Sequence, residues 1–147
     1  MRVVFLDTSG LVAASARNDR NHGPAAIELA KLKAAGARFA THTGIHIELL
    51  DTLSRLDARD GAVRLLHSLS AAERAGELEV HNLSRALIDR AAHMFAARPD
   101  KEWGLTDCIS FVLMHELGVY EAFTCDHHFE QAGFIRLIQP PKAIVGM

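Results

Sequence analysis

Residues 3–10 read VVFLDTSG, and this stretch decides the fold. Four consecutive apolar residues, three of them β-branched or aromatic, predict a short strand that is buried on both faces, as in a parallel sheet. The apolar run stops at Asp7, which places a carboxylate at the carboxyl end of this strand. Because ligands of open α/β sheets collect at the carboxyl ends of strands, Asp7 is a candidate site residue.

The apolar patterns that follow alternate between strand and helix. We expect further strands at residues 38–41, 78–81, 121–125 and 134–138. We expect helices at residues 11–16, from residue 24 to a C-cap at Gly36, and at residues 44–56, 58–74, 84–97, 106–117 and 127–132. This alternation predicts an α/β fold with a parallel sheet covered by helices on both faces. A chain of 147 residues fits a single domain, 1–147, whose last residues, 140–147, form a C-terminal tail after the Pro140-Pro141 pair.

Composition and charge restrict the class of protein. A net charge of −2 does not predict a wide basic surface for nucleic acid, so any RNA contact must be local. The two cysteines, Cys108 and Cys125, form no CxxC pair and are expected to be reduced. No run approaches the roughly 18 apolar residues of a membrane span, and the first apolar run is too short for a signal peptide. We therefore expect a cytoplasmic protein without membrane contact.

Two more aspartates stand at element boundaries. Asp107 follows Thr106, a good N-cap residue, and so falls in the first turn of a helix, where the helix dipole favours a carboxylate. Asp126 ends a predicted strand and precedes a short helix, so it can serve as an N-cap. The helix dipole alone would explain Asp107, and capping alone would explain Asp126.

Glu48 falls on a predicted helix at the edge of an apolar stripe formed by Ile45, Leu49, Thr52 and Leu56. A carboxylate beside a buried stripe is costly unless it has a partner or reaches water at the rim. Together, Asp7, Glu48, Asp107 and Asp126 can meet above one edge of the sheet. Their mutual repulsion would be relieved by a cation, and hard oxygen ligands favour Mg²⁺, with Mn²⁺ as a substitute.

Four segments carry a resemblance to a known family: FLDTS at residues 5–9, IHIELL at 45–50, WGLTDCISF at 103–111 and TCDHHFEQAGF at 124–134. In these segments the sequence resembles the PIN-domain nucleases, and more closely the VapC-like toxins of type II toxin–antitoxin pairs. The resemblance implies a three-layer α/β/α fold and Mg²⁺-dependent endonucleolytic cleavage of RNA by metal-activated water. It also implies a cognate antitoxin protein that binds over the active site, and self-association into a homodimer.

The family's acidic residues correspond to Asp7, Glu48, Asp107 and Asp126 of this chain, and Thr8 and Thr106 resemble its supporting hydroxyls. Substrate contacts are predicted from position. Arg55 and Arg59 follow the Glu48 helix and can reach phosphates, although a solvated helix end also explains them. Lys101 and Trp103 precede the Asp107 helix, where the indole can stack on an unpaired base or simply pack in the core. Leu65, Leu66 and Leu69 are candidates for a dimer contact or for the core.

Other functions are weighed on the same residues. A catalytically silent PIN-like module that binds RNA or a partner is the main alternative, and it would tolerate removal of Mg²⁺. A haloacid-dehalogenase phosphatase needs a second aspartate two residues after the first, where this chain has Ser9. A receiver domain needs paired acids early in the chain and a lysine on a late strand. The chain has no HExxH motif, and His127-His128 lacks the spacing of a zinc site.

Overall fold

The computed structural model describes residues 1–141, so most of the predicted tail at 140–147 lies outside the described residues. Five strands form one sheet: β1 (Val3–Leu6), β2 (Arg38–His42), β3 (Leu78–His81), β4 (Glu121–Phe123) and β5 (Ile135–Arg136). Their order is β3-β2-β1-β4-β5, and every neighbouring pair is parallel. The predicted parallel sheet is confirmed, with β1 at its centre.

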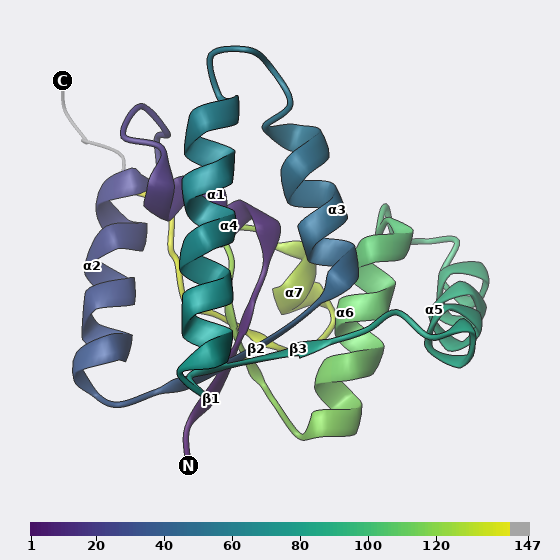
Figure 1. Cartoon of the computed structure of the whole chain (residues 1–147). Helices are drawn as coiled ribbons and strands as arrows, with labels where there is room; N and C mark the ends of the chain where they lie inside the picture. Colours follow the sequence, from purple (N-terminus) through teal and green to yellow (C-terminus); the bar gives the residue numbers. More distant parts are fainter. Residues whose placement is uncertain (142–147) are drawn as a thin grey trace, which may run out of the picture.

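Within residues 1–141, seven helices accompany the sheet: α1 (Thr8–Ser15), α2 (His22–Ala34), α3 (Thr43–Thr52), α4 (Arg59–Arg74), α5 (Arg85–Ala97), α6 (Leu105–Leu117) and α7 (His128–Gln131). Helices α2 and α4 cover one face of the sheet, α6 and α7 cover the other, and α5 packs outside α6 (Figure 1). This arrangement confirms the three-layer α/β/α class. No helix among residues 1–141 is long and apolar enough to cross a membrane.

Aromatic side chains fill the layer between β1 and the helices α6 and α7. The Phe129 ring lies 6.2 Å from the Phe5 ring and 5.0 Å from the Phe111 ring, the second pair meeting edge to face. All three side chains are fully buried, as the continuous apolar run of β1 predicts for a strand covered on both faces. This packing fixes the end of β1, from which Asp7 projects.

Several helix ends differ from the predictions, and α1 begins at Thr8 rather than at residue 11. Helix α3 ends at Thr52 rather than near residue 56, so Leu56 does not join the buried stripe and is 91% exposed. Thr52 and Ser54 have low helix propensities. The chain turns there, although the apolar period continues to Leu56. Helix α6 begins at Leu105 with Gly104 as its N-cap, so Thr106 is not the capping residue.

Gly10 allows α1 to approach the end of β4 closely. A Cβ atom at this position would overlap the Phe123 carbonyl oxygen and lie 2.7 Å from Phe123 Cδ2. The carbonyl belongs to a strand and cannot move aside without disturbing the sheet. Gly23, in α2, provides a contrast, because a Cβ atom there would meet nothing within 4 Å.

We predict that Gly10→Ala lowers the free energy of unfolding by about 2 kcal/mol or more, because the added methyl group overpacks the contact between α1 and β4. The matched change Gly23→Ala should leave stability unchanged or raise it by up to about 1 kcal/mol, since alanine favours the helix. Urea unfolding followed by circular dichroism measures both. Equal stability of the two variants would contradict the close approach.

His42 ends β2 and is fully buried. Its Nε2 lies 2.8 Å from the Ser110 hydroxyl, which itself donates to the Thr106 carbonyl, so Nε2 carries the proton and donates. The other nitrogen, Nδ1, is buried without a partner among the described residues. A proton on Nδ1 would place an unpaired charge in the core, and burial lowers the pKa of His42 to about 4.

We predict that His42 makes stability depend on pH. Its pKa is lower in the folded chain than in the unfolded chain, so its contribution is complete above about pH 6.5 and is lost as pH falls toward 4. Between pH 7 and pH 5 the loss should be about 2 kcal/mol. Urea unfolding of the wild type and of His42→Gln should differ in pH dependence by this amount, because the other titrating groups are common to both. Parallel curves would refute it.

Candidate active site

An open pocket of about 450 Å³ lies at the carboxyl edge of the sheet. Its lining includes all four predicted acids, Asp7, Glu48, Asp107 and Asp126, which come from four separate elements or their ends. Asp7 follows β1, Glu48 lies on α3, Asp107 lies in the first turn of α6, and Asp126 lies between β4 and α7. The structure therefore brings together residues that are far apart in the sequence.

Asp7 is held by two hydroxyl groups. Thr124 Oγ1 donates to Asp7 Oδ2 at 2.7 Å, and Ser9 Oγ donates to the same oxygen at 3.0 Å. The side chain is only 5% exposed, yet within residues 1–141 no protein group donates to its other oxygen, Oδ1. One oxygen is thus fixed by the protein, and the second is left for another partner.

Burial, aided by the nearby charges of Asp107 and Glu48, raises the pKa of Asp7 to about 7, although the hydrogen bonds from Thr124 and Ser9 oppose the rise. A carboxyl group with this pKa is poorly stabilised as an anion at neutral pH. A bound cation would supply the missing stabilisation.

Asp107 is fixed in the same one-sided way. Its Oδ2 accepts from the Gly104 backbone N–H at 3.3 Å and from His128 Nδ1 at 3.0 Å. Burial raises the pKa of Asp107, the negative charge of Asp126 raises it as well, and the hydrogen bond from His128 opposes both. A capping interaction at the start of α6 thus uses one oxygen of Asp107, and within residues 1–141 no protein group donates to the other.

Asp126 also combines a local bond with a place in the pocket. Its Oδ1 accepts from the His128 backbone N–H at 2.9 Å, and its Oδ2 lies 3.4 Å from His128 Nδ1. His128 therefore contacts two of the acids and lines the pocket itself. Such an imidazole orients both carboxylates.

The surroundings of the Thr8 hydroxyl indicate whether a hydrated cation fits the acid pocket. The residue is 6% exposed, lines the pocket, and its hydroxyl is buried without a partner among the described residues. Buried polar atoms without partners are rare in folded proteins and indicate an ion or water that satisfies them. Hard carboxylate and hydroxyl oxygens are the donors that Mg²⁺ prefers, so the residues present fit this ion.

Other predicted site residues lie elsewhere. Thr106 lines a neighbouring hollow between α3, α5 and α6 rather than the acid pocket. Trp103 is 6% exposed, packs edge to face on Phe111 and donates to Gln131 at 3.0 Å, so the prediction that it stacks on a base is wrong. An indole in this position contributes more as core than as a surface contact.

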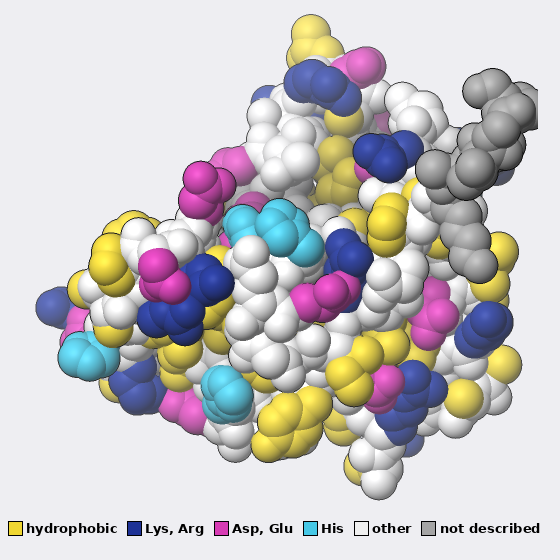
Figure 2. All heavy atoms as spheres, turned by 180° about the vertical axis from the view of Figure 1, so that it is seen from behind, with side chains coloured by type: hydrophobic (Ala, Val, Ile, Leu, Met, Phe, Trp, Pro, Cys, Tyr) yellow, Lys and Arg dark blue, Asp and Glu magenta, His cyan; other side chains and the backbone are white. Residues whose placement is uncertain are grey.

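The predicted cations also lie outside the acid pocket. Arg55 lines a separate hollow and lies 3.5 Å from Asp57, and neither Arg59 nor Lys101 lines the acid pocket. The view from behind shows Lys and Arg side chains scattered over that face, with acidic and histidine side chains beside a hollow (Figure 2). The expectation that the chain has no wide basic surface agrees with this face.

Several pocket residues were not predicted. Ser9 and Thr124 hold Asp7, and Asp19 and Asn21 line the pocket from the loop between α1 and α2. His128 also lines the pocket, although from the sequence it is considered only for the spacing of a zinc site. A usable signal was the hydroxyl residue two positions from an acid in both DTS and TCD, at residues 7–9 and 124–126. The loop at Asp19 carries only turn chemistry in the sequence.

Comparison with known proteins points to one group. No protein-family model matches the chain. Two relatives, the 23S rRNA-specific endonucleases VapC20 of Mycobacterium tuberculosis strains CDC 1551 / Oshkosh and ATCC 25618 / H37Rv, are each 26% identical over 135 residues, which cover 92% of this chain and 98% of theirs. The crystal structure of M. tuberculosis VapC20, described as a Sarcin-Ricin loop cleaving toxin, matches with a TM-score of 0.75 and 25% identity over 94% of this chain and 99% of that chain. The chain is thus similar to VapC20 in sequence and in fold, along nearly the whole length of both chains.

Proposed function

We propose that this chain is a Mg²⁺-dependent endoribonuclease and the toxin of a type II toxin–antitoxin pair. The observation that carries the proposal is the single pocket that Asp7, Glu48, Asp107 and Asp126 all line. The relatives of similar length are RNA-cleaving enzymes by name, and the match covers nearly the whole of both chains. Their named target makes ribosomal RNA the first substrate to test.

In this proposal Asp7, Asp107 and Asp126 hold Mg²⁺, and Glu48 binds it directly or through water, with Mn²⁺ as a possible substitute. When bound, the ion lowers the pKa of a coordinated water and stabilises charge on the phosphate and the leaving oxygen. The chain's own groups set the donor geometry. Ser9 and Thr124 hold Asp7 Oδ2, while Gly104 and His128 hold Asp107 Oδ2, so each acid presents its other oxygen without rotating.

The partners follow from the same surface. An RNA strand reaches the acids through the open pocket, and a cognate antitoxin is expected to cover it with a cationic segment that complements the negative charge. The homodimer remains a proposal. Leu69 is buried in the core, so only Leu65 and Leu66, which are half-buried on α4, are left of the three predicted contributors.

We predict that Asp107→Asn reduces Mg²⁺-dependent RNA cleavage by at least about 100-fold, because a donor to the ion is lost. The fold should be retained, since the change removes one of several repelling charges. The control Asp89→Asn alters an exposed acid on α5 that pairs with Arg85 and should cleave as the wild type does. Gel analysis of an RNA pool that includes ribosomal RNA, with Mg²⁺ or with EDTA, measures cleavage.

A cleavage rate of Asp107→Asn equal to the wild type would refute the assignment of the acids. RNA binding that persists in EDTA, with no cleavage in either metal, would favour the silent binding module instead. Circular dichroism of each variant shows whether a loss of activity has a trivial cause in folding.

We predict that Mg²⁺ stabilises the folded chain through Asp7. The pKa of Asp7 is raised on folding, so without metal its contribution to stability is present at low pH and is lost as pH rises through about 7. At pH 8, Mg²⁺ at about ten times its dissociation constant should add about 1.4 kcal/mol, and Asp7→Asn should gain much less. Thermal unfolding of both proteins, with Mg²⁺ and with EDTA, is the measurement. A gain of the same size in Asp7→Asn would show that the ion binds elsewhere.

A further inference from the structure

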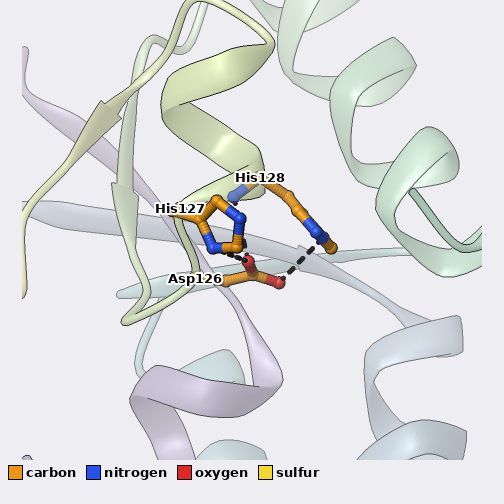
Figure 3. A group of neighbouring side chains, drawn as sticks. All are labelled: Asp126, His127 and His128. Atoms are coloured by element: carbon orange, nitrogen blue, oxygen red, sulfur yellow. Dashed lines mark hydrogen bonds and ion pairs between the residues drawn. The ribbon is translucent and has the colours of Figure 1, made fainter. Parts of the chain in front are cut away.

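A second donor group lies at the edge of the acid pocket, in the turn that leads into α7. It consists of Asp126, His127 and His128, whose side chains approach one another in Figure 3. Asp126 Oδ1 lies 3.7 Å from His127 Nδ1, and Asp126 Oδ2 lies 3.4 Å from His128 Nδ1. One donor atom from each of the three residues lies within 4.8 Å of the other two. The two imidazoles thus approach the two oxygens of one carboxylate.

The local backbone explains how adjacent histidines can share a partner. The Asp126 side chain accepts from the His128 backbone N–H and closes a tight turn, and His127 has helical φ and ψ of −65° and −16°. The two rings lie 4.6 Å apart with an interplanar angle of 54°. Sequence spacing of zinc motifs does not include neighbouring histidines, so this group is visible only in the structure.

The separations suit a transition metal. Metal–nitrogen and metal–oxygen bonds of 2.0–2.2 Å in a tetrahedral zinc site place neighbouring donor atoms about 3.3–3.6 Å apart. The 3.4 Å from His128 Nδ1 to Asp126 Oδ2 lies in this range, and the 3.7 Å from His127 Nδ1 to the other oxygen, Oδ1, lies slightly above it. Imidazole nitrogen favours Zn²⁺ and similar ions over Mg²⁺, and such ions bind mixed nitrogen and oxygen sites more tightly than Mn²⁺ does.

We propose that Asp126, His127 and His128 form a binding site for a transition-metal ion of the Zn²⁺ class. His127 has a side chain that is 66% exposed and does not line the acid pocket, so the ion can enter from solvent. The His128 side chain is 19% exposed, and its Nδ1 proton, now donated to Asp107 Oδ2 at 3.0 Å, is released to solvent when the metal binds. Asp107 Oδ2 is then the nearest further oxygen to complete the site.

Occupancy of this site has a consequence that rests on the proposed nuclease function. The Zn²⁺-class ion and Mg²⁺ both need Asp126, and the former also removes the hydrogen bond by which His128 orients Asp107. The two ions cannot both have their complete sets of ligands at the same time. The site is therefore inhibitory, and its occupancy lowers Mg²⁺-supported RNA cleavage.

The first test measures binding without reference to activity. The full chain without a histidine tag is stripped with EDTA, dialysed free of the chelator and titrated with Zn²⁺ by calorimetry, and with Co²⁺ by visible absorption, which reports nitrogen ligation. We expect one ion per chain, with an affinity at least tenfold weaker in His127→Gln. The matched variant His67→Gln changes an exposed histidine on α4 and should bind as the wild type does. Equal Zn²⁺ affinity in the wild type and His127→Gln would overturn the proposal.

The second test measures inhibition. Zn²⁺ is titrated into the Mg²⁺-supported cleavage reaction of the wild type and of His127→Gln. The variant should cleave at the wild-type rate in Mg²⁺ alone and require at least tenfold more Zn²⁺ for half-inhibition. Identical inhibition curves would overturn the inhibitory role. If neither protein cleaves RNA with any metal, the nuclease function fails, and the binding titration alone decides the metal site.

Discussion

A buried carboxylate at the end of the central strand is the constraint on which the structure depends. Asp7 is 5% exposed and surrounded by β1, α1 and the segment after β4, and its charge is opposed by burial and by two neighbouring acids. The hydroxyls of Ser9 and Thr124 repay only part of this cost, because they stabilise one oxygen. They also join α1 to the end of β4, where Gly10 lets the two elements touch. The same few contacts close the core and hold the acid in place.

Strand order explains why the other acids arrive at this point. From β1 the chain builds outward to β2 and β3 on one side, then returns to place β4 and β5 on the other, so the connections reverse direction beside β1. In open α/β sheets such a reversal leaves a crevice outside the carboxyl ends of the strands. Asp7 and Asp126 follow the adjacent strands β1 and β4, while α3 brings Glu48 from the end of β2. Convergence of the acids is thus a property of the topology, and only their identity depends on local sequence.

Most of the fold could be predicted from the sequence because strand patterns alternate with helical patterns and glycines mark several helix ends. Gly36 and Gly76 follow α2 and α4 with positive φ, where residues without a Cβ atom are favoured. Errors arose where two local signals competed. Thr106 has the chemistry of an N-cap, yet the extended backbone at Gly104 caps the helix two residues earlier in the chain. Leu56 continues an apolar period that the helix does not follow.

Only the charged residues of the candidate site could be predicted from the sequence. A carboxylate at a strand end is conspicuous, whereas a hydroxyl such as Thr124 becomes significant only when its distance to Asp7 is known. The burial of Trp103 could not be predicted either, because the sequence does not distinguish an exposed indole from a buried one. Comparison with VapC20 supports the fold and the chemistry but not the role of individual side chains, at 25–26% identity.

Asp126 belongs to both proposed metal sites, which favour different ions. On one side it faces Asp7, Asp107 and Glu48, a set of hard oxygens in which charge and size favour Mg²⁺. On the other side it faces two imidazoles, which favour an ion with stronger nitrogen affinity. Because both sets share this carboxylate, their occupancies are linked, and each ion lowers the apparent affinity of the other by the same factor. In the two proposals such a coupling needs no conformational change, since Asp126, the residue that both donor sets share, lies in the turn that links β4 to α7.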